Sequence, residues 1–129
     1  MATAIKNART LVAAATSNAA AGTTRGTLQL STAMGGILTF KMTNGATGPT
    51  VQCSANVLVA HNASLPTAAS AGTDWKTVYS VGNGTTANTV GEWNYTVGPA
   101  VGNLEVEFTG NTAQAVTVEA FLTELTSVG

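Results

Sequence analysis

The clearest fold signal lies in residues 104–122, LEVEFTGNTAQAVTVEAFL. Apolar and polar side chains alternate in residues 104–109 and again in 116–122, and the polar segment 110–114 separates the two runs. Alternation with a period of two is typical of a strand that buries one face in a core. The segment therefore predicts two antiparallel strands joined as a hairpin. Its expected core side chains are Leu104, Val106, Phe108, Val116, Val118, Ala120 and Leu122.

Six further strands are expected upstream of this pair. Runs rich in Thr, Val and Ile are separated by Gly, Asn and Pro, which is typical of an all-β domain. In residues 50–61, for example, Cys53, Ala55 and Val57 belong to one apolar face. The expected strands cover about residues 8–15, 26–33, 36–43, 50–61, 75–81 and 92–97.

The strand count and the spacing of the turns predict an all-β fold, an antiparallel β-sandwich of about eight strands, with a jelly roll as one form it can take. A length of 129 residues fits a single domain. Polar residues 16–18 interrupt the Ala-rich segment 13–21 and compete for its backbone hydrogen bonds, which disfavours a helix there. We therefore expect a flexible, extended N-terminal arm, residues 1–25, and a β-sandwich domain, residues 26–129.

The surface is expected to carry few charges. Charged residues make up 9% of the chain, against about a quarter in an ordinary soluble protein, so Thr, Ser, Asn and Gln must cover much of the exterior. Such a surface has few like charges to oppose association. The formal net charge of -1 provides no basic footprint, which argues against a nucleic-acid partner.

Cys53 is the only cysteine, which excludes an intrachain disulfide and a metal site built from cysteines. The longest apolar run near the start, residues 11–15, is too short to span a membrane, and the start has no apolar region of signal-peptide type. We therefore expect no membrane partner and synthesis in a reducing cytoplasm, with Cys53 as a small core residue.

Few residues could support catalysis. A Ser-His-Asp arrangement would need His61 and Asp74, the sole members of their kinds, and the chain has no G-x-S-x-G motif. Cys53 and His61 lie eight residues apart in one expected strand, about 26 Å at strand rise, so they cannot pair within a subunit. We expect no enzyme, no catalytic residue and no cofactor.

Paired carboxylates offer another candidate site. Glu105 and Glu107 share a strand face, and Glu119 is expected opposite them in the final hairpin, which could suit a glycosidase pair or a calcium ion. Calcium loops usually supply several Asp or Asn ligands, whereas this chain has one Asp. A solvated or inter-subunit sheet face is the simpler interpretation, and no metal is expected.

Two aromatic pairs allow a similar choice. Trp75 with Tyr79, or Trp93 with Tyr95, could stack against a sugar ring. Their alternation with polar neighbours favours packing in the core.

Charge is distributed unevenly along the chain. The first 41 residues carry four basic side chains and no acid, whereas residues 74–129 hold all six acids and one lysine. This asymmetry suggests self-assembly in which the arm of one subunit contacts the acidic sheet of another. A solvated arm without a partner is the alternative. The expected contact residues are Lys6, Arg9 and Arg25 in the arm and Glu105, Glu107 and Glu119 in the sheet.

Two segments carry a resemblance to known proteins. Residues 35–49, GGILTFKMTNGATGP, and residues 104–112, LEVEFTGNT, resemble small β-sandwich accessory proteins of tailed-bacteriophage virions. Proteins of that kind decorate or cement the head lattice, often as trimers, or sit on the neck or tail. The resemblance therefore implies a virion component.

Together these features predict a non-enzymatic structural virion protein of a bacteriophage, a capsid decoration or cement protein located in the virion. Its expected partners are copies of itself, with a trimer favoured, and the major capsid protein or another virion protein. The arm and the loops 43–49, 62–73 and 82–91 would make the contacts. A neck or tail accessory protein and a host-surface carbohydrate-binding module are the alternatives.

Overall fold

A computed structural model describes residues 4–67 and 74–128, in which eight strands account for all the regular secondary structure. The strands are antiparallel wherever they pair. Their bounds are β1 Ala4–Asn18, β2 Thr23–Gln29, β3 Gly36–Asn44, β4 Ser54–Ala60, β5 Trp75–Gly82, β6 Val90–Val97, β7 Asn103–Thr109 and β8 Val116–Val128.

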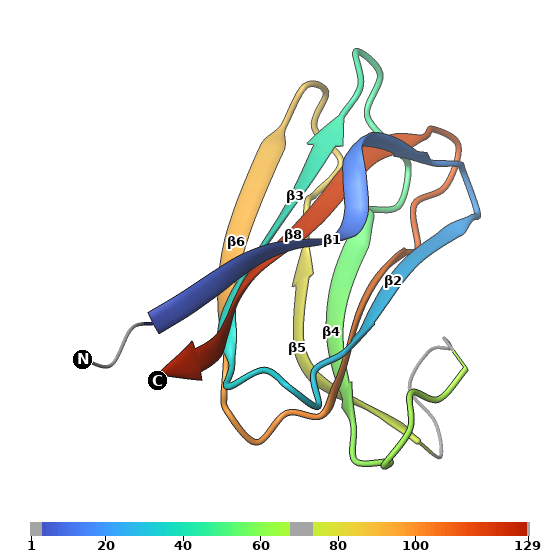
Figure 1. The fold of residues 1–129 in the computed structure, drawn as a ribbon. Coiled ribbons are helices and arrows are strands. Elements are labelled where there is room, and N and C mark those ends of the chain that lie inside the picture. The colour runs from blue at the N-terminus through green and yellow to red at the C-terminus, as the bar shows by residue number, and fades with distance from the viewer. Residues whose placement is uncertain (1–3, 68–73, 129) are drawn as a thin grey trace.

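The strands form two four-stranded sheets that pack face to face (Figure 1). Sheet A has the order β1-β8-β3-β6, and sheet B has the order β2-β7-β4-β5. Successive strands alternate between the sheets except for β4 and β5, which is the connectivity of a jelly roll. The predicted antiparallel β-sandwich of eight strands is confirmed, and the described residues contain no helix.

The core lies between the inner faces of the two sheets. Phe40 and Phe108 are its largest buried side chains, one from each sheet. All seven core residues expected in 104–122 are buried, as is Cys53. Val51 is different: the pattern in residues 50–61 places it on the same apolar face, but β4 begins only at Ser54 and Val51 is 51% exposed.

The last two strands do not form the predicted hairpin. β7 pairs with β2 and β4 in sheet B, whereas β8 pairs with β1 and β3 in sheet A. The segment between them crosses from one sheet to the other, with positive φ angles at Gly110 and Ala113. Alternation shows that each strand buries one face, but it does not show whether the two inner faces belong to one sheet or to opposite sheets. Consequently Glu119 does not lie opposite Glu105 and Glu107.

The first 25 residues do not form a separate arm. Residues 4–18 form β1, which pairs with β8, and β2 already begins at Thr23. The alternation in β1 is hidden because its register shifts at three places and Ala15 has a positive φ. Most of its side chains are also small and exposed, so few apolar residues mark an inner face. The strand is held mainly by its backbone pairing with β8.

One side of the sandwich is closed by a close approach of the backbones of β1 and β2. A Cβ atom added at Gly26 in β2 would lie 2.2 Å from the carbonyl oxygen of Leu11 in β1. Only glycine leaves room for this contact.

The opposite side, between β5 and β6, is filled by aromatic rings. Trp93 stacks on the buried Phe40 with ring centroids 5.9 Å apart, and Tyr79 contacts Phe40 and Tyr95 at 6.3 and 5.8 Å. Trp75 is buried and donates its indole N–H to the Thr67 carbonyl oxygen at 2.9 Å. The predicted core packing is confirmed for Tyr79, Trp93 and Tyr95, which pack against the main core, whereas Trp75 lies in a separate buried cluster.

Candidate interaction surfaces

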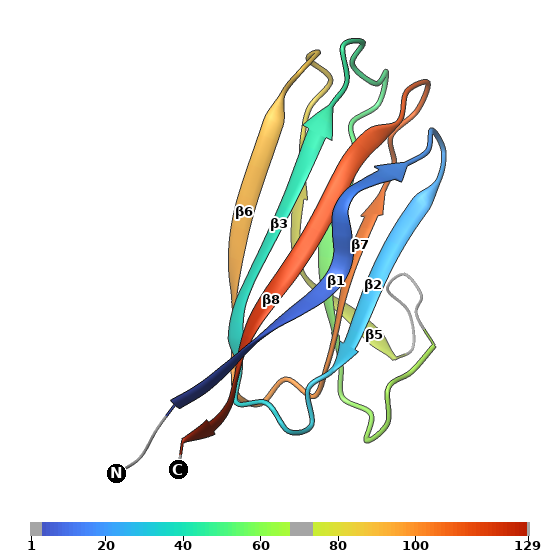
Figure 2. The ribbon, with the colours of Figure 1, turned by 45° about the horizontal axis from the view of Figure 1, so that its top comes forward.

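Four connections meet at one end of the sandwich, opposite the chain termini (Figure 2). They are residues 19–22, 45–53, 83–89 and 110–115. Backbone hydrogen bonds join them: Ala21 N–H donates to Asn111 O at 2.8 Å, and Asn88 N–H donates to Gly45 O at 2.9 Å. We call these four connections the loop end. Because these hydrogen bonds join the connections to one another, we interpret the loop end as one rigid surface.

A buried pair of asparagines ties two of these connections together. The Asn111 side chain is fully buried, and its Nδ2 donates to the carbonyl oxygens of Asn18, Ala19 and Gln114 at 3.1, 3.4 and 2.9 Å. Its Oδ1 accepts a bond from Asn18 Nδ2 at 2.6 Å. The Asn111 amide therefore donates to backbone carbonyl oxygens of two connections: Asn18 O and Ala19 O at the β1–β2 connection, and Gln114 O in the β7–β8 connection.

A second buried pair ties the other two connections. Asn83 Nδ2 donates to Asn44 Oδ1 at 3.0 Å, and Asn44 Nδ2 donates to the carbonyl oxygens of Gly84 and Thr86 at 3.2 and 2.9 Å. Both side chains are buried. The Asn-Gly steps at 44–45 and 83–84 indicate turns in the sequence, but they do not reveal that the asparagine side chains face each other.

The structure places two of the three predicted contact loops side by side. Loops 43–49 and 82–91 both belong to the loop end, where Asn44 N–H donates to Thr89 O at 2.9 Å. Of the third loop, 62–73, residues 62–67 lie at the opposite end (Figure 1), and residues 68–73 lie outside the described part of the chain. The described residues of the third loop, 62–67, therefore do not share a contact surface with the other two loops.

Arg25, Glu107 and Asn56 form a hydrogen-bonded row across the outer face of sheet B. Arg25 NH2 donates to Glu107 Oε2 at 3.0 Å, and Asn56 Nδ2 donates to Glu107 Oε1 at 2.9 Å. Ser80 Oγ extends the row by donating to Asn56 Oδ1 at 2.7 Å. The predicted basic and acidic contact residues Arg25 and Glu107 thus meet within one subunit.

Much of the rest of this face is covered by the chain itself. Glu105 is fully buried, with Arg25 Nε 3.8 Å from its Oε1. Leu58, Ala60 and Trp75 form a small buried cluster separate from the main core. Residues 61–67 are anchored nearby, since Asn103 Nδ2 donates to Asn62 O at 2.8 Å and Gln29 Nε2 donates to Ala63 O at 3.3 Å.

Arg9 is likewise engaged within its own subunit. Its NH1 lies 3.0 Å from Glu124 Oε1, and the Glu124 side chain is nearly buried. Of the six expected contact residues, Arg9, Arg25, Glu105 and Glu107 therefore have intrachain ionic neighbours. Lys6 and Glu119 have none within 4.0 Å among the described residues.

The outer face of sheet A is open. Pairing of β3 with β8 and β6 places Lys41 between Glu119 and Glu92, which forms an acidic row with a formal charge of -1 across three strands. Ile37 lies four residues before Lys41 on the same face and is 49% exposed. The face also bears several threonines and the half-buried Phe121.

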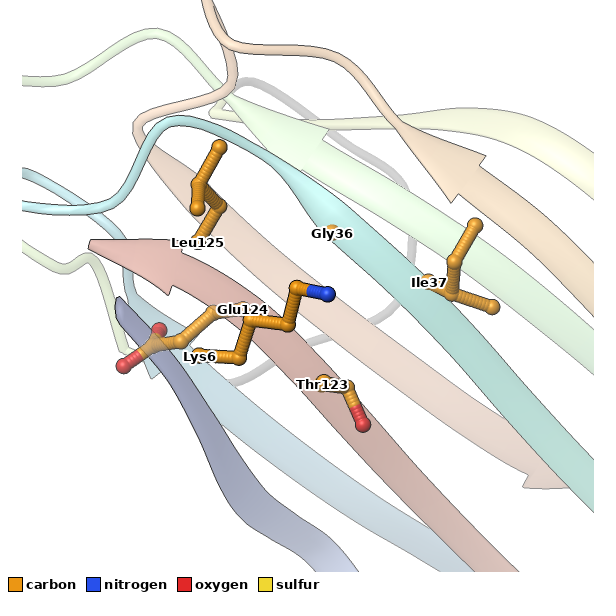
Figure 3. Close-up of a pocket in the computed structure, with 6 residues that line it drawn as sticks. All are labelled: Lys6, Gly36, Ile37, Thr123, Glu124 and Leu125. Atoms are coloured by element: carbon orange, nitrogen blue, oxygen red, sulfur yellow. The ribbon is translucent and has the colours of Figure 1, made fainter. Parts of the chain in front are cut away.

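A shallow pocket of about 290 Å³ lies at the end of this face nearest the termini (Figure 3). The backbones of β3 and β8 lie close together there: a Cβ atom added at Gly36 would lie 2.2 Å from Thr123 O, so only glycine fits at this position. Its lining residues are Lys6, Gly36, Ile37, Thr123, Glu124 and Leu125.

Cys53 is an inert core residue. Burial raises the pKa of its thiol from 9.0 to about 11, although the Asn18 side chain and the Thr109 backbone offset part of that increase. The unfolded chain loses the thiol proton at lower pH than the folded chain, so the folded state becomes less stable as pH rises from about 9 to about 11.

We expect this difference in thiol pKa to lower the free energy of unfolding by about 2 kcal/mol across that pH range. Urea unfolding at several pH values measures the loss. Cys53→Ala is the control, because it removes the titrating thiol while all lysines and tyrosines remain. Equal pH dependence in the two proteins would contradict the assignment.

Within residues 4–67 and 74–128, no cluster of three or more His, Cys, Asp or Glu side chains could hold a metal ion. The same residues contain no helix long and apolar enough to cross a membrane.

No protein-family model matches the sequence, and no curated protein sequence matches it. Solved structures do resemble the fold. The K3 cleaved adhesin domain of Lys-gingipain from Porphyromonas gingivalis has a TM-score of 0.55 at 11% identity, over 79% of this chain and 63% of that one. A chain of the infectious bursal disease virus particle has a TM-score of 0.52 at 9% identity, over 95% of this chain and 31% of that one.

A family 16 carbohydrate-binding module has a TM-score of 0.46 at 10% identity, over 88% of this chain and 72% of that one. This chain spans less than two thirds of the adhesin domain and about a third of the viral chain. At such low identity the two closer likenesses show the fold alone. They agree with the strand order in defining the chain as a β-sandwich protein.

Proposed function

We propose that this chain is a non-enzymatic structural protein of a bacteriophage virion, a capsid decoration or cement protein. The observation that carries the proposal is the rigid loop end. Four connections joined by backbone bonds and two buried asparagine pairs present a surface that is already ordered before binding. Preorganisation of this kind reduces the entropy cost of attaching to a lattice.

The chemistry of the loop end suits contact with a protein lattice. Its residues are mainly Thr, Asn, Ala and Gly, with no charged residue in its four connections. Val51 projects from it with half of its surface exposed. A neutral surface with an exposed aliphatic side chain matches the polar and apolar character of ordinary protein interfaces.

The resemblance of two sequence segments and a likeness in fold support the same role. Residues 35–49 and 104–112 resemble accessory proteins of tailed-phage virions. A virus particle also contains a chain with this β-sandwich fold, although that likeness extends only to the fold. Meanwhile, the two shortest ion pairs of the described residues, Arg9 with Glu124 and Arg25 with Glu107, lie within one subunit and serve the fold itself.

The loop-end contact is tested by adding recombinant chain to phage heads from which the native protein has been stripped. We expect the wild-type chain to sediment with the heads and Val51→Asp to lose at least about tenfold in affinity, because the contact would bury an unpaired charge. Val78→Asp is the matched control, since Val78 is 42% exposed in the distant strand β5. Equal binding by the two variants would exclude the loop end as the attachment surface.

A further inference from the structure

The end of sheet A nearest the termini is a two-stranded ribbon. β3 begins at Gly36, which pairs with Glu124, whereas β1 and β8 continue pairing to Ala4 and Val128. Figure 2 shows the ends of β1 and β8 extending beyond the other strands. All of residues 4–8 are exposed, and Ile5 is 48% exposed. A ribbon of two strands buries little by itself.

Lys6 gives this ribbon an available positive charge. It lines the pocket beside Ile37 and Leu125 (Figure 3). Among the described residues, no carboxylate lies within 4.0 Å of its ammonium group. The nearest basic side chain in sequence, Arg9, is instead paired with Glu124.

The acidic row lies on the same face, further from the ribbon. Lys6 pairs in register with Leu125, and Glu119 lies six residues from Leu125 along β8, which corresponds to about 20 Å at strand rise. This distance excludes an ion pair between Lys6 and Glu119 within one subunit. Ile37 and Phe121 lie between the two charged positions on the sheet.

We propose that the outer face of sheet A binds a second copy of this chain in a two-fold symmetric dimer, with Lys6 of each copy against the Glu92–Lys41–Glu119 row of the other. A copy turned end for end over this face brings unlike charges together at both ends. It also places the two exposed Ile37 side chains near the centre. Because both charged positions share one face, two copies satisfy the contact and the assembly closes.

The two outer faces of the sandwich differ in a way that favours sheet A. Sheet B is partly covered by residues 61–67, and its Arg25–Glu107 pair is satisfied internally. Sheet A carries threonines between the longer side chains of its outer face, and two packed sheets lie about 10 Å apart. Four strands about 4.8 Å apart and about eight residues long give roughly 500 Å² of sheet per copy, so we expect a dimer of micromolar affinity.

Size-exclusion chromatography with light scattering, from about 1 to 200 µM chain, measures the dimer directly. We expect Ile37→Asp to raise the dissociation constant at least about 30-fold, and Lys6→Glu or Glu119→Lys alone to raise it about tenfold. The double variant Lys6→Glu/Glu119→Lys should recover most of the wild-type affinity, because the swapped charges attract again. Higher salt should weaken the wild-type dimer.

Val51→Asp separates this contact from attachment to a capsid. Because Val51 lies at the loop end, Val51→Asp should weaken binding to heads and leave the dimer unchanged. Ile37→Asp should weaken the dimer and leave binding to heads unchanged. Circular dichroism confirms that each variant folds. A monomer throughout the concentration range, a trimer, or a charge swap that fails to restore dimerisation would overturn the proposal.

Discussion

Replacing Gly26 by alanine is expected to destabilise the folded chain by about 3 kcal/mol or more. The added Cβ atom would lie 2.2 Å from Leu11 O and 2.5 Å from Leu11 C. Both are backbone atoms of β1, so no side-chain rotation can relieve the overlap. β1 and β2 would have to separate, which opens the closed side of the sandwich and exposes the core next to Val12.

Thermal unfolding followed by circular dichroism measures this effect, and the expected loss lowers the midpoint by roughly 10 °C or more. Gly102→Ala is the matched control, because no heavy atom lies within 4 Å of a Cβ added there. That variant should stay within about 1 kcal/mol of the wild type. Similar midpoints for the two alanine variants would show that β1 and β2 do not approach as closely as described.

Replacing Asn111 by aspartate is expected to cost about 3 kcal/mol or more at neutral pH. The substitution removes the Nδ2 donor shared by three backbone carbonyl oxygens and places a buried carboxylate against them. Burial should raise the pKa of the new carboxyl above its unfolded value. The variant therefore loses stability as pH rises above about 4, and acid should restore part of the loss.

Urea unfolding at pH 4 and pH 7 tests this expectation. Asn88→Asp introduces the same change into the same loop end, but its side chain is exposed and its positive φ of 60° is tolerated by aspartate. We expect it to change stability by less than about 0.5 kcal/mol. A loss for Asn111→Asp no greater than for Asn88→Asp would mean that the asparagine pair does not hold the loop end together.

The strands were predictable because they depend on local alternation. β3, β5 and β7 begin and end within one residue of the ranges expected from sequence. Sheet membership was not predictable for β7 and β8, because an apolar inner face looks the same in either sheet. The strand expected over residues 8–15 lies within β1, but the full length of β1, Ala4–Asn18, was hidden by its register shifts and small side chains, which leave pairing with β8 as its main support.

The candidate site was likewise predictable from the sequence only in part. The charge asymmetry predicted that basic residues near the start of one subunit contact acids of another subunit, and that contact between subunits stays a prediction. However, Arg25 and Glu107 pair through adjacent strands of one subunit, which only the register reveals. The roles of Asn18 and Asn111 depend on loops 93 residues apart in the chain, so no local pattern could assign them.

The proposed function is tested most directly by counting this chain in purified virions. Trypsin should release residues 26–41, GTLQLSTAMGGILTFK, and an isotope-labelled copy of that peptide allows quantification by mass spectrometry. If the chain is a capsid decoration protein, the number of its copies per copy of the major capsid protein should be close to stoichiometric. This ratio should be the same in every fraction of the particle band. Absence of the peptide from the particles, or only a few copies per particle, would contradict decoration of the head.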